Sequence, residues 1–155
     1  MENCYQKVRH LFILYFLILV VVSSCNQKFD FGYSNDKATY IANVNCFREN
    51  YSIIYNPANS TPSIYYSPSF VTKHAVCGEL YTLMQRHGID FVNFERDSTI
   101  SFYSVVQKGI MDKQFILMFI TDRGNIHDKI TADMKILDKK DSNCYELEKV
   151  ISLAN

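Results

Sequence analysis

The chain has 155 residues, and its 16 basic and 16 acidic side chains leave a formal net charge of zero. This balance excludes the net basic face that nucleic-acid binding requires, and the length fits one domain behind a leader segment. Phe and Tyr number eleven each, whereas Gly and Pro are scarce and Trp is absent. Because aromatic and β-branched residues favour strands, this composition predicts a sheet-rich core.

The N-terminal end of the chain has the order of an export signal. Lys7 and Arg9 precede an unbroken apolar run at 11–22, and two serines at 23–24 lead to Cys25. A helix over this run would be about 18 Å long, too short for a hydrocarbon core about 30 Å thick. The run is therefore predicted to be the core of a signal peptide rather than a permanent membrane span.

The end of this segment resembles the lipobox of bacterial lipoproteins, in which lipid is attached to a cysteine and signal peptidase II cuts just before it. Val22 is the aliphatic residue, 23–24 are the small residues, and Cys25 would become the first residue of the mature chain. The resemblance implies removal of residues 1–24, a lipid anchor on Cys25 and a place in the bacterial cell envelope. Asn26 after the cysteine implies the outer membrane, facing either side. Ordinary secretion and an uncleaved anchor remain alternatives.

Residues 25–37 are expected to carry the lipidated cysteine and then a short tether or a first strand. Aromatic and small or acidic residues alternate just behind the anchor, which predicts a strand. Two other readings stay open: an aromatic foot resting at the lipid headgroups, and a disordered tether. The alternating residues are Phe29, Asp30, Phe31, Gly32 and Tyr33.

Residues 38–155 are expected to form a single globular α+β domain, because no repeat or low-complexity stretch divides them. The patterning predicts a mostly antiparallel sheet with helices packed on one face. The expected strands are 38–47, 51–55, 91–95, 99–106, 114–121 and 130–136.

Two helices complete the predicted domain. The central one covers about 68–87, with Ser67 as its cap, Pro68 at its first position and Gly88 just past its end. A short C-terminal helix at 144–154 is predicted from an apolar stripe at helical spacing. That stripe consists of Leu147, Val150, Ile151 and Ala154.

Three cysteines follow Cys25 in the mature chain: Cys46, Cys77 and Cys144. Export exposes them to oxidising chemistry, but an odd number permits at most one intramolecular bridge. The pairing Cys46–Cys144 is favoured, with Cys77 buried in the central helix. The other pairings and three free thiols remain open.

No zinc-protease pattern, phosphate-binding glycine loop, nucleophile elbow or paired-cysteine metal motif occurs. No catalytic residue, metal site or cofactor is therefore predicted. The densest polar cluster follows the strand at 114–121 and is a candidate binding loop, since loops on rigid strands often carry function. An ordinary solvated loop is the rival reading. The cluster consists of Asp122, Arg123, Asn125, His127 and Asp128.

These features predict a small membrane-anchored lipoprotein whose domain is non-catalytic and binds a protein partner or a small ligand. One version is an immunity-type protein that neutralises a toxin. The alternatives are an envelope hydrolase that uses His127 and Asp128, and a structural envelope component without a discrete ligand. The segment 97–99 resembles the O-glycosylation acceptor of Bacteroidota, so glycosylation of Ser98 or Thr99 is left open.

Overall fold

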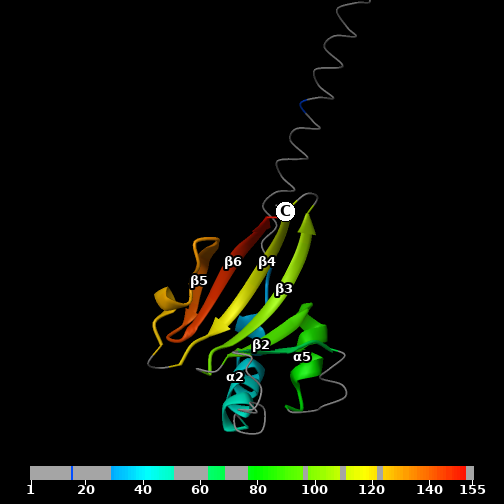
Figure 1. Cartoon of the computed structure of the whole chain (residues 1–155). Helices are drawn as coiled ribbons and strands as arrows, with labels where there is room; N and C mark the ends of the chain where they lie inside the picture. The colour runs from blue at the N-terminus through cyan, green and yellow to red at the C-terminus, as the bar shows by residue number, and fades with distance from the viewer. Residues whose placement is uncertain are drawn as a thin grey trace, which may run out of the picture.

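The computed structural model describes residues 15, 29–50, 63–68, 77–95, 98–108, 111–121 and 124–152. Within them the chain forms a six-stranded antiparallel sheet covered by helices, which confirms the predicted α+β fold (Figure 1). The elements are α2 (Tyr33–Glu49), β1 (Ser63–Tyr66), α5 (Leu80–His87), β2 (Phe91–Glu95), β3 (Ile100–Lys108), β4 (Met111–Phe119), the 3-10 turn η1 (Ile126–Asp128), β5 (Met134–Asp141) and β6 (Cys144–Ser152).

The strand order is β1-β2-β3-β4-β6-β5, so the last strand of the chain lies between β4 and β5. The connection from β4 to β5 must therefore pass β6, and η1 lies on this connection. Ile126 of η1 is buried in a cluster with Ile116 and Met118 of β4 and Leu147 of β6. The β4–β5 connection thus covers the sheet face opposite the helices.

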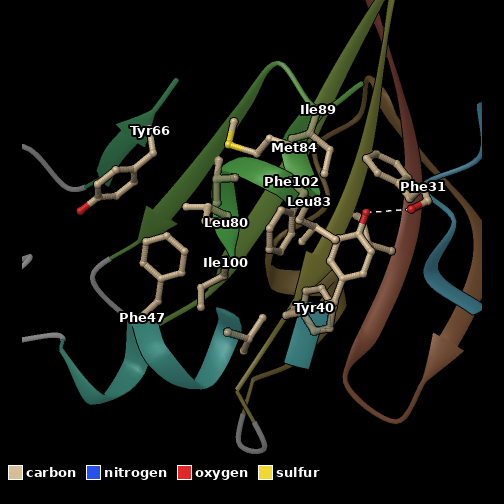
Figure 2. Packing of buried hydrophobic residues seen from close by; sticks show 14 of the residues in the cluster. Phe31, Tyr40, Phe47, Tyr66, Leu80, Leu83, Met84, Ile89, Ile100 and Phe102 are labelled. Atoms are coloured by element: carbon tan, nitrogen blue, oxygen red, sulfur yellow. Dashed lines mark hydrogen bonds between the residues drawn. The ribbon is translucent and has the colours of Figure 1, made fainter. Parts of the chain in front are cut away.

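The other face of the sheet packs against α2 and α5. Tyr40 of α2 is completely buried, and its ring centroid lies 5.1 Å from that of Phe102 and 6.2 Å from that of Phe119. Its hydroxyl donates a 2.8 Å hydrogen bond to the backbone carbonyl of Phe31 (Figure 2). Other members of this core, drawn in Figure 2, include Phe47, Tyr66, Leu80, Leu83, Met84, Ile89 and Ile100.

The segment directly before α2 belongs to the core. The Phe29 ring lies 4.8 Å from Phe31 and 5.7 Å from Phe115 of β4, between ring centroids, and Phe31 is buried. Tyr33 begins α2. The predicted strand at 29–33 is therefore absent, and the three rings pack within the domain rather than forming a foot on the membrane.

The predicted strand at 38–47 is wrong, because this stretch lies inside α2. Tyr40, Val44 and Phe47 are buried, and their spacing of four and three residues places them on one helical face. The Tyr, Ile, Val and Phe residues of this stretch favour strands locally, which is why the sequence predicts one. Contact of that helical face with the aromatic rings of the sheet selects the helix.

The structure also differs from the two predicted helices. The central one begins at Leu80 rather than 68, since Cys77, Gly78 and Glu79 form a bend and turn before it. It ends at His87 as predicted, with Gly88 in the left-handed region at φ 60°. Pro68 is helical and Ser67 is not, while 69–76 lie outside the described residues.

The predicted C-terminal helix at 144–154 is wrong, because 144–152 form β6. β6 pairs along its length with β4 and also with β5. Both edges of β6 are hydrogen-bonded to strands that precede it in the chain. This pairing is not local, so the apolar stripe within 144–154 does not indicate it.

The remaining strand predictions fall into three groups. Those at 91–95, 99–106 and 114–121 are confirmed as β2, β3 and β4, with boundaries shifted by a few residues. The one at 130–136 is correct only from Met134, where β5 begins. The one at 51–55 lies outside the described residues.

A disulfide joins Cys46 of α2 to Cys77 in the turn before α5. This bond replaces the expected pairing of Cys46 with Cys144, which is a buried free thiol. The expected pairing relied on Cys77 lying inside a helix, whereas the turn brings Cys77 against α2. The disulfide therefore ties the two helices on one sheet face together.

Among the glycines that the structure describes, Gly32 alone combines a positive φ with a close contact at the place of a Cβ. Its φ is 60°, and a Cβ there would lie 2.3 Å from Cε1 of His87, whose ring is held 2.6 Å from Asp36. We expect Gly32→Ala to lower the free energy of unfolding by about 2 kcal/mol or more. Gly78→Ala is the control, because a Cβ at Gly78 meets nothing within 4 Å. Equal urea midpoints for the two variants would contradict this account.

The disulfide closes a loop with a sequence separation of 31. We expect the double variant Cys46→Ser/Cys77→Ser to lose about 3.5 kcal/mol of stability, because the bridge restricts the unfolded chain. Peptide mapping under non-reducing conditions should recover a Cys46–Cys77 linked pair, and Cys144→Ala should leave that pair in place. A linked pair containing Cys144 would contradict the structure.

Candidate functional site

The predicted binding loop lies on the β4–β5 connection. His127 and Asp128 are exposed on η1, and the Asn125 side chain accepts a 3.1 Å hydrogen bond from the His127 backbone N–H. Asn125 therefore caps the turn, which is a structural role. Asp122 and Arg123 lie outside the described residues. The described part of this loop brings no third polar group toward His127 and Asp128.

A hollow of about 150 Å³ lies elsewhere, between α2 and the turn that joins β5 to β6. We call it the α2–hairpin hollow. Neither charge patterning nor the predicted elements indicated it, because Ile41, Val44 and Asn45 of its wall lie in the stretch 38–47, for which the sequence predicts a strand. It is lined by Tyr33, Ile41, Val44, Asn45, Arg48, Phe119, Asp141, Ser142, Asn143 and Cys144.

One face of α2 forms the first wall of this hollow. Ile41, Val44, Asn45 and Arg48 recur at intervals of three and four residues, so their side chains project in the same direction. The opposite wall is the β5–β6 turn at 141–144. Rigid elements therefore hold both walls in place.

One guanidinium nitrogen of Arg48 is hydrogen-bonded within the protein, and another is not. Its Nη2 donates a 3.0 Å hydrogen bond to the backbone carbonyl of Ile120, whose own N–H bonds to the Asn143 carbonyl at 2.9 Å. The Nε of Arg48 is buried and has no hydrogen-bond partner. The unpaired, buried N–H is a local energetic cost of this packing.

Tyr33 is a second buried polar group in this lining, beside Cys144 and Asp141. It is only 4% exposed, and its hydroxyl is buried without a hydrogen bond of normal geometry. Burial raises the pKa of Tyr33 well above its ordinary value, and the nearby Cys144 and Asp141 raise it further. The hydroxyl therefore keeps its proton at neutral pH and can donate it in a hydrogen bond.

Cys144 is a neutral part of the same lining. Burial is the main cause that raises the pKa of its thiol to about 12. Thiolates rather than thiols act as nucleophiles, so this cysteine is unsuited to covalent chemistry at neutral pH.

One ion pair stands beside the hollow. Lys37 Nζ lies 2.7 Å from Asp141 Oδ2, and this contact lowers the pKa of Asp141. Asp141 is therefore ionised and already paired. The charge of Arg48 remains as the local excess.

A second polar cluster joins the two helices outside this hollow. Asp36, where α2 departs from helical geometry, accepts a 2.8 Å hydrogen bond from Arg86 and lies 2.6 Å from His87 Nε2. These two contacts lower the pKa of Asp36. Because the His87 ring also stacks on Tyr40, the cluster serves to join α2 to α5.

A third cluster lies on β5 and β6. Glu146 is 2% exposed and sits 2.7 Å from Lys140 Nζ, which in turn contacts Asp138 at 2.9 Å. The hydrogen bond to Glu146 is the main cause that raises the pKa of Lys140. Across the described ranges, no group of three or more histidine, cysteine, aspartate or glutamate side chains is placed to hold a metal ion.

Comparison of the chain with protein-family models, curated proteins and solved structures finds no match in any of the three. Among the helices of the described residues, none combines the length and the apolar character needed to cross a membrane. The function must therefore be inferred from the geometry of the α2–hairpin hollow and from the N-terminal sequence.

The buried hydroxyl of Tyr33 makes a direct prediction about stability. Tyr33→Phe keeps the ring contacts with Tyr40 and Phe119 but removes a buried hydroxyl that makes no hydrogen bond of normal geometry. We expect the ligand-free variant to be more stable by about 1 kcal/mol, measured by urea unfolding. Tyr81→Phe, at an exposed position, should change nothing. A loss of stability in Tyr33→Phe would show that the hydroxyl is bonded within the protein.

Proposed function

We propose that the protein is a small lipoprotein of the bacterial envelope, anchored through lipid on Cys25, with a non-catalytic domain that binds a partner close to the membrane. The observation that carries this proposal is the position of Phe29. Its ring packs on Phe31 and Phe115, so the folded domain begins four positions after the proposed lipidation site.

This spacing sets how far the domain extends from the membrane. Four residues, fully extended, span at most about 14 Å, so the anchor and the core are joined by a short connection. A domain held so close presents its binding surfaces to molecules at the membrane rather than to distant ones. The sequence from Lys7 to Cys25 supports export and lipidation, and Asn26 supports the outer membrane.

The chemistry of the hollow supports binding rather than catalysis. Cys144 and Tyr33 line it, and burial raises the pKa of both, which keeps them protonated. His127 and Asp128 are exposed on η1, away from any convergent group in the described part of the loop. What the hollow offers is an apolar wall of Ile41, Val44 and Phe119 beside Arg48, which suits recognition.

The test is metabolic labelling with a clickable palmitate analogue, combined with membrane fractionation. We expect label and membrane retention in the wild type, and loss of both in Cys25→Ala, because the thiol is the attachment point. Cys4→Ala is the matched control and should keep both, since residue 4 lies in the predicted leader. Label that persists in Cys25→Ala, or is absent from the wild type, would overturn the anchor.

A further inference from the structure

We infer that the lipid bilayer contacts the domain at one end of the sheet, which we call the Met111 end. There β4 begins at Met111, which pairs with Lys108 of β3 on one side and with Ser152 of β6 on the other. This inference rests on the proposed lipid anchor at Cys25 and goes beyond it, since it names the surface of the domain that meets the membrane. The direction of the N-terminal segment, its length and the side chains near this end carry the inference.

The N-terminal segment runs alongside β4 in the same direction as the strand. Phe29 stacks on Phe115, with the two ring centroids 5.7 Å apart. Tyr33 lies beside Phe119, with the two ring centroids 5.9 Å apart. The two contacts are separated by the same number of positions in the segment and in the strand. The chain therefore enters the domain from the Met111 end and proceeds toward α2.

The connection between the anchor and the domain is no longer than the part of the sheet beside it. Cys25 precedes Phe29 by four positions, which span at most about 14 Å when fully extended. Phe115 follows Met111 by four positions of β4, and at about 3.4 Å per residue this distance is also about 14 Å. A bilayer that holds the lipid of Cys25 therefore lies no farther from Phe29 than the Met111 end does. The domain cannot be lifted clear of the membrane, so this end of the sheet contacts the headgroups.

The side chains described near this end suit a lipid surface. Val150 of β6 pairs with Lys113 and is 41% exposed, which makes it one of the few large apolar side chains exposed in the described residues. Glu148 lies 2.5 Å from Lys113, and Asp133 lies 3.2 Å from Lys149. Both carboxylates are thus neutralised by lysines, which reduces their repulsion from anionic headgroups. An aliphatic side chain among balanced charges matches the boundary between headgroups and acyl chains.

The opposite end of the sheet points away from the bilayer. Cys144 at the start of β6 pairs with Phe119 and lies eight positions from Ser152, a distance of about 27 Å along the strand. Figure 1 shows α2 and α5 toward this end, and the last residues of β3 and β6 at the other. The α2–hairpin hollow, which Cys144 lines, is therefore held above the membrane and stays open to the partner.

The experiment measures which end of the domain lies near the lipid. The chain has no Trp, so one introduced Trp is its only indole fluorophore. Val150→Trp reports on the Met111 end. The matched control is Ile41→Trp, because Ile41 is also β-branched, is 37% exposed and lines the hollow at the opposite end. Each full, lipidated variant is reconstituted into phosphatidylethanolamine–phosphatidylglycerol vesicles, with or without phosphatidylcholine that carries a nitroxide on its headgroup.

We expect the nitroxide to quench most of the fluorescence of Val150→Trp and little of that of Ile41→Trp, because the two positions differ in height by about 20 Å. Insertion of about ten Gly and Ser residues between Gln27 and Lys28 lengthens the connection by up to about 35 Å. In this variant Val150→Trp should lose most of its quenching, since the tether no longer holds the Met111 end against the bilayer. Unchanged far-ultraviolet circular dichroism shows that each variant is folded.

Vesicle flotation separates the orientation of the domain from the anchor on which it depends. A protein that does not float lacks the anchor, and both proposals then fail together. A protein that floats but shows equal quenching at the two positions, or stronger quenching of Ile41→Trp, keeps its anchor and overturns the orientation. Quenching of Val150→Trp that survives the insertion would overturn the short tether as its cause.

Discussion

The packing of Tyr40 between α2 and the sheet is the interaction on which the rest of the domain depends. Its buried ring contacts Phe102 and Phe119, and its hydroxyl holds the Phe31 carbonyl, so one side chain joins the helix, two strands and the N-terminal segment. Because the hydroxyl is paired, the burial of this polar group carries no unmet hydrogen bond. The contact sets the height of α2 above β4, and that height leaves the α2–hairpin hollow open beside it.

The same face of the sheet holds two contrasting kinds of polar group. Asp36, Arg86 and His87 satisfy one another and join the helices, whereas Arg48 keeps its Nε–H unpaired. The first group has a structural role, which leaves the hollow as the candidate site.

The sequence was informative where local pattern and tertiary contact agree. The apolar run in β4 and the glycine after α5 could be read directly, since strand periodicity and left-handed capping are local properties. The sequence predicts a strand for part of α2 because its residues suit a strand. The helix is favoured by a tertiary contact, the packing of Tyr40 on the rings of Phe102 and Phe119. The candidate site could not be predicted from the sequence for the same reason, since Tyr33 and Arg48 line one hollow only when α2 is helical. β6 was likewise predicted as a helix, because Leu147, Val150 and Ile151 have helical spacing and the pairing with β4 and β5 is not local.

The placement of β6 has a consequence for the order of assembly. β5 pairs with β6 alone among the described strands, and β6 fills the space beside β4, so neither edge is satisfied until the last strand arrives. During synthesis, β4 and β5 therefore each expose an open strand edge until Cys144–Ser152 has been made. Removal of β6 (Cys144–Ser152) would leave both edges available to other chains and would favour aggregation over a smaller folded domain.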